Sequence, residues 1–324
     1  MLETHILKFR QSVLKMDDPK HLDEDRSVGM KGKKKITGVY APMVIPFAND
    51  RIVFHGLAAN VEKMNSSALA GYFVLGTNGE YKSLSVPERF SVLKTVIAHS
   101  AGDKMIMAGM GFESTHETIE NVLLAADLGA ASVSLLMPHF FAKRMSPAVM
   151  ASYIVEVADA SPIPVVLYNN PAVAAGVTIR ADTIGLVKDH PNVIGIKDSS
   201  KETYRENLEA AGDAMCVLAG SANYFMDLMK NGGAGGVLSL ANIFPEACGK
   251  LYQLIKAGKT KEAEELDAIL VNLNHAVSGS YGVAGVKAAM DFRGFAGGVP
   301  RRPLPGLTPE QHESLKKIVD GVKL

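Results

Sequence analysis

The sequence predicts an α/β fold, a (β/α)₈ TIM barrel followed by a C-terminal helical extension. Short apolar segments alternate with longer amphipathic ones, and eight such pairs occupy residues 36–257. Near-continuous apolar strands are expected where helices cover a parallel sheet, and eight strand–helix units are typical of a closed barrel. A doubly wound open sheet is the alternative, but no Gly-x-Gly-x-x-Gly follows the first predicted strand.

The predicted strands are short, rich in apolar residues, and bounded by Gly, Pro or Asn. They are residues 36–43, 71–75, 104–109, 132–136, 164–168, 193–197, 215–219 and 235–239. Amphipathic periods between them predict helices, one of which begins near Pro87, since proline is favoured in the first helical turn. The others are residues 115–128, 146–158, 178–188, 201–211, 222–230 and 243–256.

The chain divides into three predicted parts. Residues 1–35 form an appendage that ends in a lysine-rich linker, residues 36–257 form the barrel, and residues 258–324 form a helical bundle. Within the bundle we expect helices over residues 259–276, 282–292 and 309–322. The appendage has a weakly helical pattern and could pack as an arm on a neighbouring subunit.

Composition limits the partners of the chain. Its 324 residues carry a formal net charge of zero, which argues against a nucleic acid or an anionic membrane as partner. No apolar run is long enough to cross a bilayer, and the first residues have neither a signal-peptide core nor the composition of a transit peptide. Two cysteines in apolar segments, Cys216 and Cys248, favour a reducing, cytoplasmic location, and no His/Cys cluster has zinc-site spacing.

A lysine ends the sixth predicted strand, in the run Asn192-Val-Ile-Gly-Ile-Lys-Asp198. An isolated buried charge is costly, so such a lysine shifts its pKa, finds a partner or takes part in chemistry. A desolvated amine can form a Schiff base with a carbonyl substrate. The alternative is a strand-end lysine that reaches water or pairs with Asp198, and this run alone favours that alternative.

Alternation along the strands relates Lys197 to a tyrosine on the preceding strand. Alternate residues of a barrel strand face the interior. If Lys197 points inward, so do Gly195 and Val193. If Tyr168 points inward, so does Val166. Both polar groups then enter the barrel at the C-terminal ends of neighbouring strands, where the active sites of such barrels lie.

Two further segments could serve the same site. Gly76-Thr-Asn-Gly-Glu80 follows the second strand, and its backbone amides could form an anion site, although Asn-Gly is also a common turn dipeptide. Tyr168 is followed closely by Pro171, and its phenol could relay a proton or simply pack with its hydroxyl in water.

Two other features carry less weight. The segment Gly232 to Gly236 lacks the Gly-Lys-Ser/Thr ending of a phosphate loop, and we interpret it as a tight entry into the eighth strand. His139 follows the fourth strand and could line the barrel mouth, but a lone histidine is more often ordinary polar lining.

Taken together, the lysine on strand six, the tyrosine ending strand five and the Gly-Thr loop after strand two resemble a known family. It is the N-acetylneuraminate lyase / dihydrodipicolinate synthase superfamily of class I Schiff-base aldolases and lyases. The resemblance covers residues 36–322, and the motifs occur in the family's order and spacing. It implies a barrel with a C-terminal helical extension that assembles as a homotetramer.

The resemblance also implies roles for individual residues. Lys197 would form the Schiff base with a 2-oxo acid, usually pyruvate, and Tyr168 would shuttle protons beside it. Thr77 would hydrogen-bond Tyr168, the backbone from Thr77 to Gly79 would hold the keto-acid carboxylate, and Glu80 would be structural. Because the protonated imine is itself an electron sink, no metal or diffusible cofactor is expected. Lys197 must be neutral to attack, so burial that lowers its pKa would help.

Three departures separate the chain from dihydrodipicolinate synthases. Those enzymes have a second threonine where this chain has Asn78, and a tyrosine that reaches a neighbouring subunit where it has Phe140. They also have an arginine for the aldehyde's carboxylate where it has Val173. Phenylalanine cannot relay a proton and valine cannot pair with a carboxylate. These losses weigh against condensation of pyruvate with aspartate semialdehyde, which stays an alternative.

The sequence is more similar to 4-hydroxy-2-oxoglutarate aldolases, in the runs Lys197-Asp-Ser199 and Leu218-Ala-Gly-Ser221 among others. By that analogy Asn78 and Ser199 contact the distal part of the substrate, and Gly220 is a further substrate-binding position. The products would be pyruvate and an aldehyde, glyoxylate.

Other functions stay open at this point. Sugar-acid aldolases of the same superfamily differ mostly in the distal pocket. A non-catalytic barrel that binds a keto acid is an alternative of another class, although a nucleophilic amine in a pocket favours the lyase. A phosphate-sugar isomerase barrel is a third possibility, and imine trapping distinguishes it, because an isomerase need not form an imine.

Overall fold

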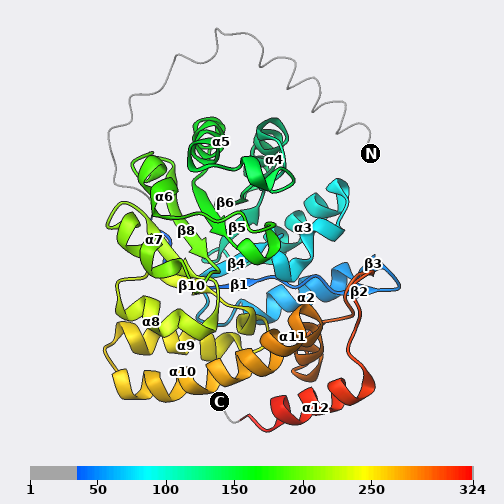
Figure 1. Ribbon diagram of the computed structural model, residues 1–324. Helices are drawn as coiled ribbons and strands as arrows, with labels where there is room; N and C mark the ends of the chain where they lie inside the picture. Colours follow the sequence, from blue (N-terminus) through cyan, green and yellow to red (C-terminus); the bar gives the residue numbers. More distant parts are fainter. Residues whose placement is uncertain (1–34, 323–324) are drawn as a thin grey trace. The chain divides into compact units, whose positions relative to one another are not determined.

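Eight parallel strands close into a barrel in the computed structural model, which describes residues 35–322 (Figure 1). Around the barrel the order is β1-β10-β9-β8-β7-β6-β5-β4. These strands are β1 (Gly38–Pro42), β4 (Gly71–Val74), β5 (Met105–Gly109), β6 (Ser132–Leu136), β7 (Val165–Asn169), β8 (Val193–Asp198), β9 (Cys216–Ala219) and β10 (Gly235–Val237). Every predicted strand matches one of them to within two residues at each end. The predicted barrel is therefore confirmed.

Helices alternate with the barrel strands, and all of them except α2 correspond to predicted helical segments. They are α2 (Phe54–Met64), α3 (Val86–His99), α4 (Thr115–Asp127), α5 (Pro147–Ala160), α6 (Ala181–Val187), α7 (Tyr204–Ala211), α8 (Phe225–Lys230) and α9 (Pro245–Lys256). Local sequence sets the start of α3, where Ser85 and Glu88 form a capping box around Pro87 in the first turn.

Two elements near the start of the barrel were not among the predicted segments. One is α2, and the other is the antiparallel pair β2 (Phe47–Ala48) and β3 (Arg51–Ile52). Asn49 and Asp50 connect β2 to β3 with φ values of 49° and 66°, the left-handed conformation that tight hairpin turns require. Strands of two residues are too short to produce a recognisable alternation of apolar and polar positions.

Three helices follow the barrel and form the C-terminal extension, as predicted. They are α10 (Thr260–Asn274), α11 (Ser280–Phe292) and α12 (Pro309–Asp320). A π-helical turn over His275–Gly279 joins α10 to α11, and Gly282 kinks α11 with φ 54° and ψ −141°. Figure 1 shows α10 running beside α9, so the extension packs on the barrel's own helices.

Some predictions concern parts of the chain that the structure leaves undescribed. The appendage over residues 1–35 lies outside the described residues except for its last one. From residue 35 to residue 322, no helix combines the length and the apolar composition that a bilayer crossing demands. Cys216 and Cys248 are both free thiols.

The pairing of β7 with β8 positions the predicted site. Tyr168 pairs with Lys197 and Val166 pairs with Gly195, so these residues share one face of the sheet. The register shifts between Val165 and Val166, because Val165 pairs with Val193. The alternation predicted from the sequence therefore holds from Gly195 onward and cannot be extended to Val193.

Candidate active site

Lys197 projects from the C-terminal end of β8 into an aromatic pocket. It is 4% exposed, and its Nζ lies 3.9 Å from the ring centroid of Tyr168 and 4.5 Å from that of Phe73. Burial lowers the pKa of the Lys197 ammonium, and the neighbouring Tyr168 opposes this only in part. The lowered pKa increases the share of neutral amine at a given pH, and the neutral amine is the form that attacks a carbonyl.

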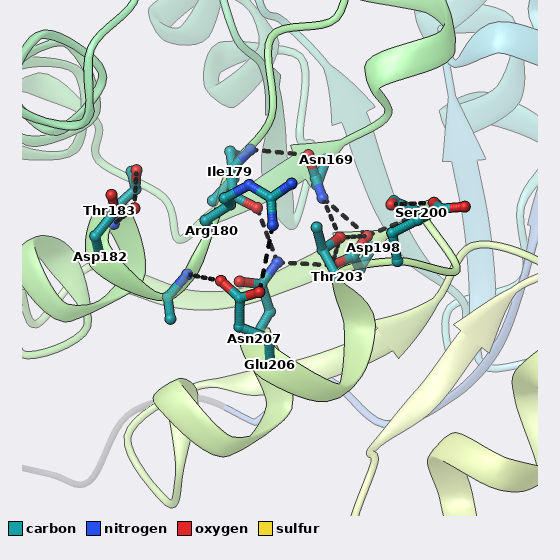
Figure 2. Close-up of polar contacts among 12 residues, drawn as sticks. Asn169, Ile179, Arg180, Asp182, Thr183, Asp198, Ser200, Thr203, Glu206 and Asn207 are labelled. Carbon is teal, nitrogen blue, oxygen red and sulfur yellow. Dashed lines mark hydrogen bonds and ion pairs between the residues drawn. The ribbon is translucent and has the colours of Figure 1, made fainter.

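Among the described residues, Asp198 does not form an ion pair with Lys197. Its carboxylate instead joins a buried polar network with groups from β7, the loop after β8, and α7 (Figure 2). Burial raises the pKa of Asp198, and four donors oppose this. The donors are Ser200 N at 2.9 Å, Asn169 Nδ2 at 2.9 Å, Thr203 Oγ1 at 3.0 Å and Asn207 Nδ2 at 2.7 Å. The network fixes the end of the strand that carries Lys197.

Tyr168, near the end of β7, contacts polar residues from two neighbouring segments of the predicted site. Its Oη is 2.9 Å from Thr77 Oγ1 and accepts a hydrogen bond from Asn170 Nδ2 at 2.9 Å. The ring meets Phe73 edge to face, with centroids 5.7 Å apart. Burial raises the pKa of Tyr168, but the charge of Lys197 and the hydrogen bonds from Thr77 and Asn170 outweigh it, so the pKa lies below its usual value. The phenol is thereby suited to exchange protons.

The glycine loop after β4 forms a 3₁₀ turn, Thr77–Gly79, at the same end of the barrel. The Gly79 N–H already donates to Gly76 O at 3.1 Å. The amides at the start of such a turn have no partner within it, so the N–H groups of Thr77 and Asn78 are not used by the turn itself. The Asn78 side chain donates to Ser239 Oγ at 3.0 Å, which ties the loop to the segment after β10.

Ser199 and Gly220 lie against each other after β8 and β9. Ser199 N donates to Asn169 O at 2.8 Å, and Gly220 N donates to Asp198 O at 2.6 Å. A Cβ atom on Gly220 would come within 2.0 Å of Ser199 Oγ. Glycine is therefore required here for Ser199 to keep its place, and the structure brings both predicted positions to the barrel end that holds Lys197.

Three neighbours of the site were missed by sequence reasoning. The ring of Phe73 makes a cation–π contact with the Lys197 ammonium. Asn170 donates a hydrogen bond to Tyr168, and Ser239 accepts one from Asn78. Asn170 could have been found, because it follows Tyr168 by two residues in the Tyr-Asn-Asn-Pro run. Nothing in the sequence around Ser239 indicates that it approaches a loop so distant along the chain.

The remaining residues singled out from the sequence lie around the mouth or away from it. The ring of His139 is 3.3 Å from the Glu113 carboxylate, so it belongs to a surface pair. Phe140 is 78% exposed and Val173 is 39% exposed, and neither makes a polar contact through its side chain. The segment Gly232 to Gly236 leads directly into β10, which begins at Gly235, as the sequence interpretation expects.

Comparisons with known proteins identify a family for the chain. A sequence model of the Dihydrodipicolinate synthetase family matches residues 35–322. The chain is 33% identical over 300 residues to a protein of Emericella nidulans named "Probable 4-hydroxy-2-oxoglutarate aldolase, mitochondrial", with 89% of this chain and 95% of that protein covered. It is 28% identical to the L-threo-3-deoxy-hexylosonate aldolase of Hypocrea jecorina, with 88% and 95% covered.

A solved structure has the same fold. YagE, a prophage protein of E. coli K12 that belongs to the dihydrodipicolinic acid synthase family, was crystallised in complex with pyruvate. It matches this chain with a TM-score of 0.82 at 25% sequence identity, and the match covers 88% of this chain and 98% of YagE.

Proposed function

The chain belongs to the Dihydrodipicolinate synthetase family and is a class I aldolase, which is a lyase. We propose that it cleaves 4-hydroxy-2-oxoglutarate, or a closely similar 2-oxo acid. The products would be pyruvate and glyoxylate or a related aldehyde. The observation that carries the proposal is the position of Lys197, buried against Tyr168, whose hydroxyl is held by Thr77. The similarity to the Emericella nidulans protein supports the choice of substrate.

The first half of the reaction forms the imine. The neutral Lys197 amine attacks the C2 carbonyl of the keto acid, and loss of water from the carbinolamine gives a protonated imine. Tyr168, hydrogen-bonded to Thr77, donates and accepts the protons of these steps. The amides of Thr77 and Asn78 hold the adjacent carboxylate.

The second half breaks the C3–C4 bond. Tyr168 accepts the proton of the C4 hydroxyl, the C3–C4 bond breaks to release glyoxylate, and the bonding electrons move into the imine to form an enamine. Tyr168 then returns the proton to C3, and hydrolysis of the imine by water releases pyruvate and restores the Lys197 amine. Asn78, Ser199 and Gly220 surround the distal part of the substrate, where neutral donors would replace the arginine of the synthases.

Borohydride reduction in the presence of pyruvate tests the mechanism. We expect a covalent adduct that peptide mapping places on Lys197. Lys287 serves as an internal control, because it is also fully buried but is paired with Glu80. A folded protein that yields no adduct on Lys197 would contradict the proposal.

Cleavage assays test the substrate. We expect kcat/KM for 4-hydroxy-2-oxoglutarate to exceed that for L-threo-3-deoxy-hexylosonate by about ten-fold or more, since each lost polar contact to the distal group leaves a buried donor unpaired. The second substrate is included because of the Hypocrea jecorina relative. The reverse preference would assign the chain to the sugar-acid aldolases. Efficient condensation of pyruvate with aspartate semialdehyde would show that Asn78, Phe140 and Val173 do not exclude synthase activity.

We also propose that the chain forms a homotetramer and works in the cytoplasm. The tetramer rests on the family resemblance, and light scattering should give four times the 34.5 kDa chain mass. A monomer would contradict it. The cytoplasmic location rests on the two free cysteines, and the word mitochondrial in the name of the Emericella nidulans relative makes cell fractionation the deciding measurement.

A further inference from the structure

A buried ion pair links the glycine loop to the C-terminal extension. Lys287 Nζ, from α11, lies 2.6 Å from Glu80 Oε1, and the two side chains are 0% and 1% exposed. Both charges have therefore left water completely. A buried pair of this kind is weak support for stability as such, because the cost of desolvating two charges offsets their attraction. Its position directly after the glycine loop indicates another role.

The ammonium of Lys287 contacts two backbone carbonyls and an aromatic ring as well as Glu80. Besides the Glu80 carboxylate, it donates to Ile45 O at 2.9 Å and to Val299 O at 2.8 Å. It also lies 4.4 Å from the ring centroid of Phe47. Two hydrogen bonds and the ion pair restrain the ammonium from three directions, so Lys287 helps to fix the position of the Glu80 carboxylate.

The second oxygen of Glu80 is also bound by the C-terminal extension. Glu80 Oε2 accepts a hydrogen bond from Arg301 N at 2.8 Å. The Arg301 guanidinium in turn holds both oxygens of Glu88 in the first turn of α3, at 2.8 and 2.7 Å. Lys287 and Arg301 therefore each bind one oxygen of Glu80, and the Arg301 side chain also connects this group to the start of α3.

Glu80 itself has a conformation that needs such support. Its φ of 51° and ψ of 38° lie in the left-handed region, between the 3₁₀ turns Thr77–Gly79 and Tyr81–Ser83. A residue with a Cβ persists there only when its surroundings enforce it. Its N–H donates to Thr77 O at 2.9 Å, so the backbone of Glu80 directly supports the residue that contacts Tyr168.

We propose that Lys287 is a positioning residue for the keto-acid site, which acts through Glu80 to hold Thr77 and Asn78 in place for the substrate carboxylate. The C-terminal extension then completes the active site as well as covering the barrel. This inference rests on the proposed function, because it assigns the Thr77 loop to carboxylate binding.

The test uses pyruvate as the probe and the yield of borohydride-trapped adduct on Lys197 as the readout. We compare the wild type with Lys287→Met, with the neutral pair Glu80→Gln/Lys287→Met, and with Lys63→Met. Lys63 is a matched control, because it also holds the C-terminal segment, through Arg293 O and Gly294 O, without touching Glu80. Thermal unfolding is measured for each variant.

We expect the half-saturating pyruvate concentration to rise at least about ten-fold in Lys287→Met, since misplacement by about 1 Å can cost about 10²-fold. The neutral pair should recover thermal stability, because no lone charge stays buried, but it should not recover pyruvate affinity. Lys63→Met should keep the wild-type affinity.

Two results would overturn the inference. One is an unchanged half-saturating concentration in Lys287→Met, and the other is a neutral pair that recovers affinity together with stability. If Lys287→Met fails to fold, the neutral pair alone decides between these outcomes. Absence of any adduct in the wild type would instead overturn the proposed function itself, so the two failures are distinguishable.

Discussion

Replacing Lys197 with alanine should abolish turnover and remove the borohydride-trapped adduct. The substitution deletes the only atom that can bond to the substrate in the proposed mechanism, and loss of a covalent nucleophile costs on the order of 10⁶-fold in rate. The rings of Tyr168 and Phe73, which lie 3.9 and 4.5 Å from the amine, carry no nitrogen that could replace it. Steady-state cleavage and intact mass after reduction are the measurements.

The pH dependence of Lys197 gives an independent check. Because burial lowers the pKa of this lysine, imine formation should rise as pH increases through a pKa below the usual lysine value. In the unfolded chain the same lysine is charged at neutral pH, so its burial costs stability there, and that cost fades as pH approaches the usual pKa. Lys197→Met should therefore be at least as thermally stable as the wild type.

Full activity in the Lys197→Ala variant would refute the Schiff-base mechanism.

The second large effect concerns Tyr168. We expect Tyr168→Phe to lower kcat by about 10²-fold or more, the scale of a lost acid–base group. The ring still packs edge to face on Phe73, so the variant should fold and bind pyruvate. Only the hydroxyl that meets Thr77 and Asn170 is removed. The measurement is kcat at saturating substrate beside the half-saturating pyruvate concentration for trapping.

Thr77→Val is the matched control for this prediction. It deletes the hydroxyl that meets Tyr168 but leaves the phenol and the Asn170 donor in place. Its kcat should fall less than that of Tyr168→Phe. A Tyr168→Phe variant with wild-type kcat would show that another group moves the proton, and a raised half-saturating concentration without a change in kcat would assign Tyr168 to binding alone.

The regular part of the fold could be predicted because it is local. Strand and helix periods depend on neighbouring residues, so every barrel strand was found to within two residues. The pair β2 and β3 was not, because two residues carry no period. Bounds were least accurate for α6, predicted over residues 178–188 and observed over Ala181–Val187, since helix ends depend on capping and packing.

By itself the sequence determined the barrel, the order of its elements, and the shared barrel end at which Lys197, Tyr168 and Thr77 lie. A parallel barrel gathers all strand ends on one rim, so chain order alone places such residues together. Only the tertiary structure decided that Asp198 turns away from Lys197 into its own network and that Lys287 reaches Glu80. Side-chain partners distant along the chain depend on how helices pack around the barrel, and no local pattern in the sequence records that packing.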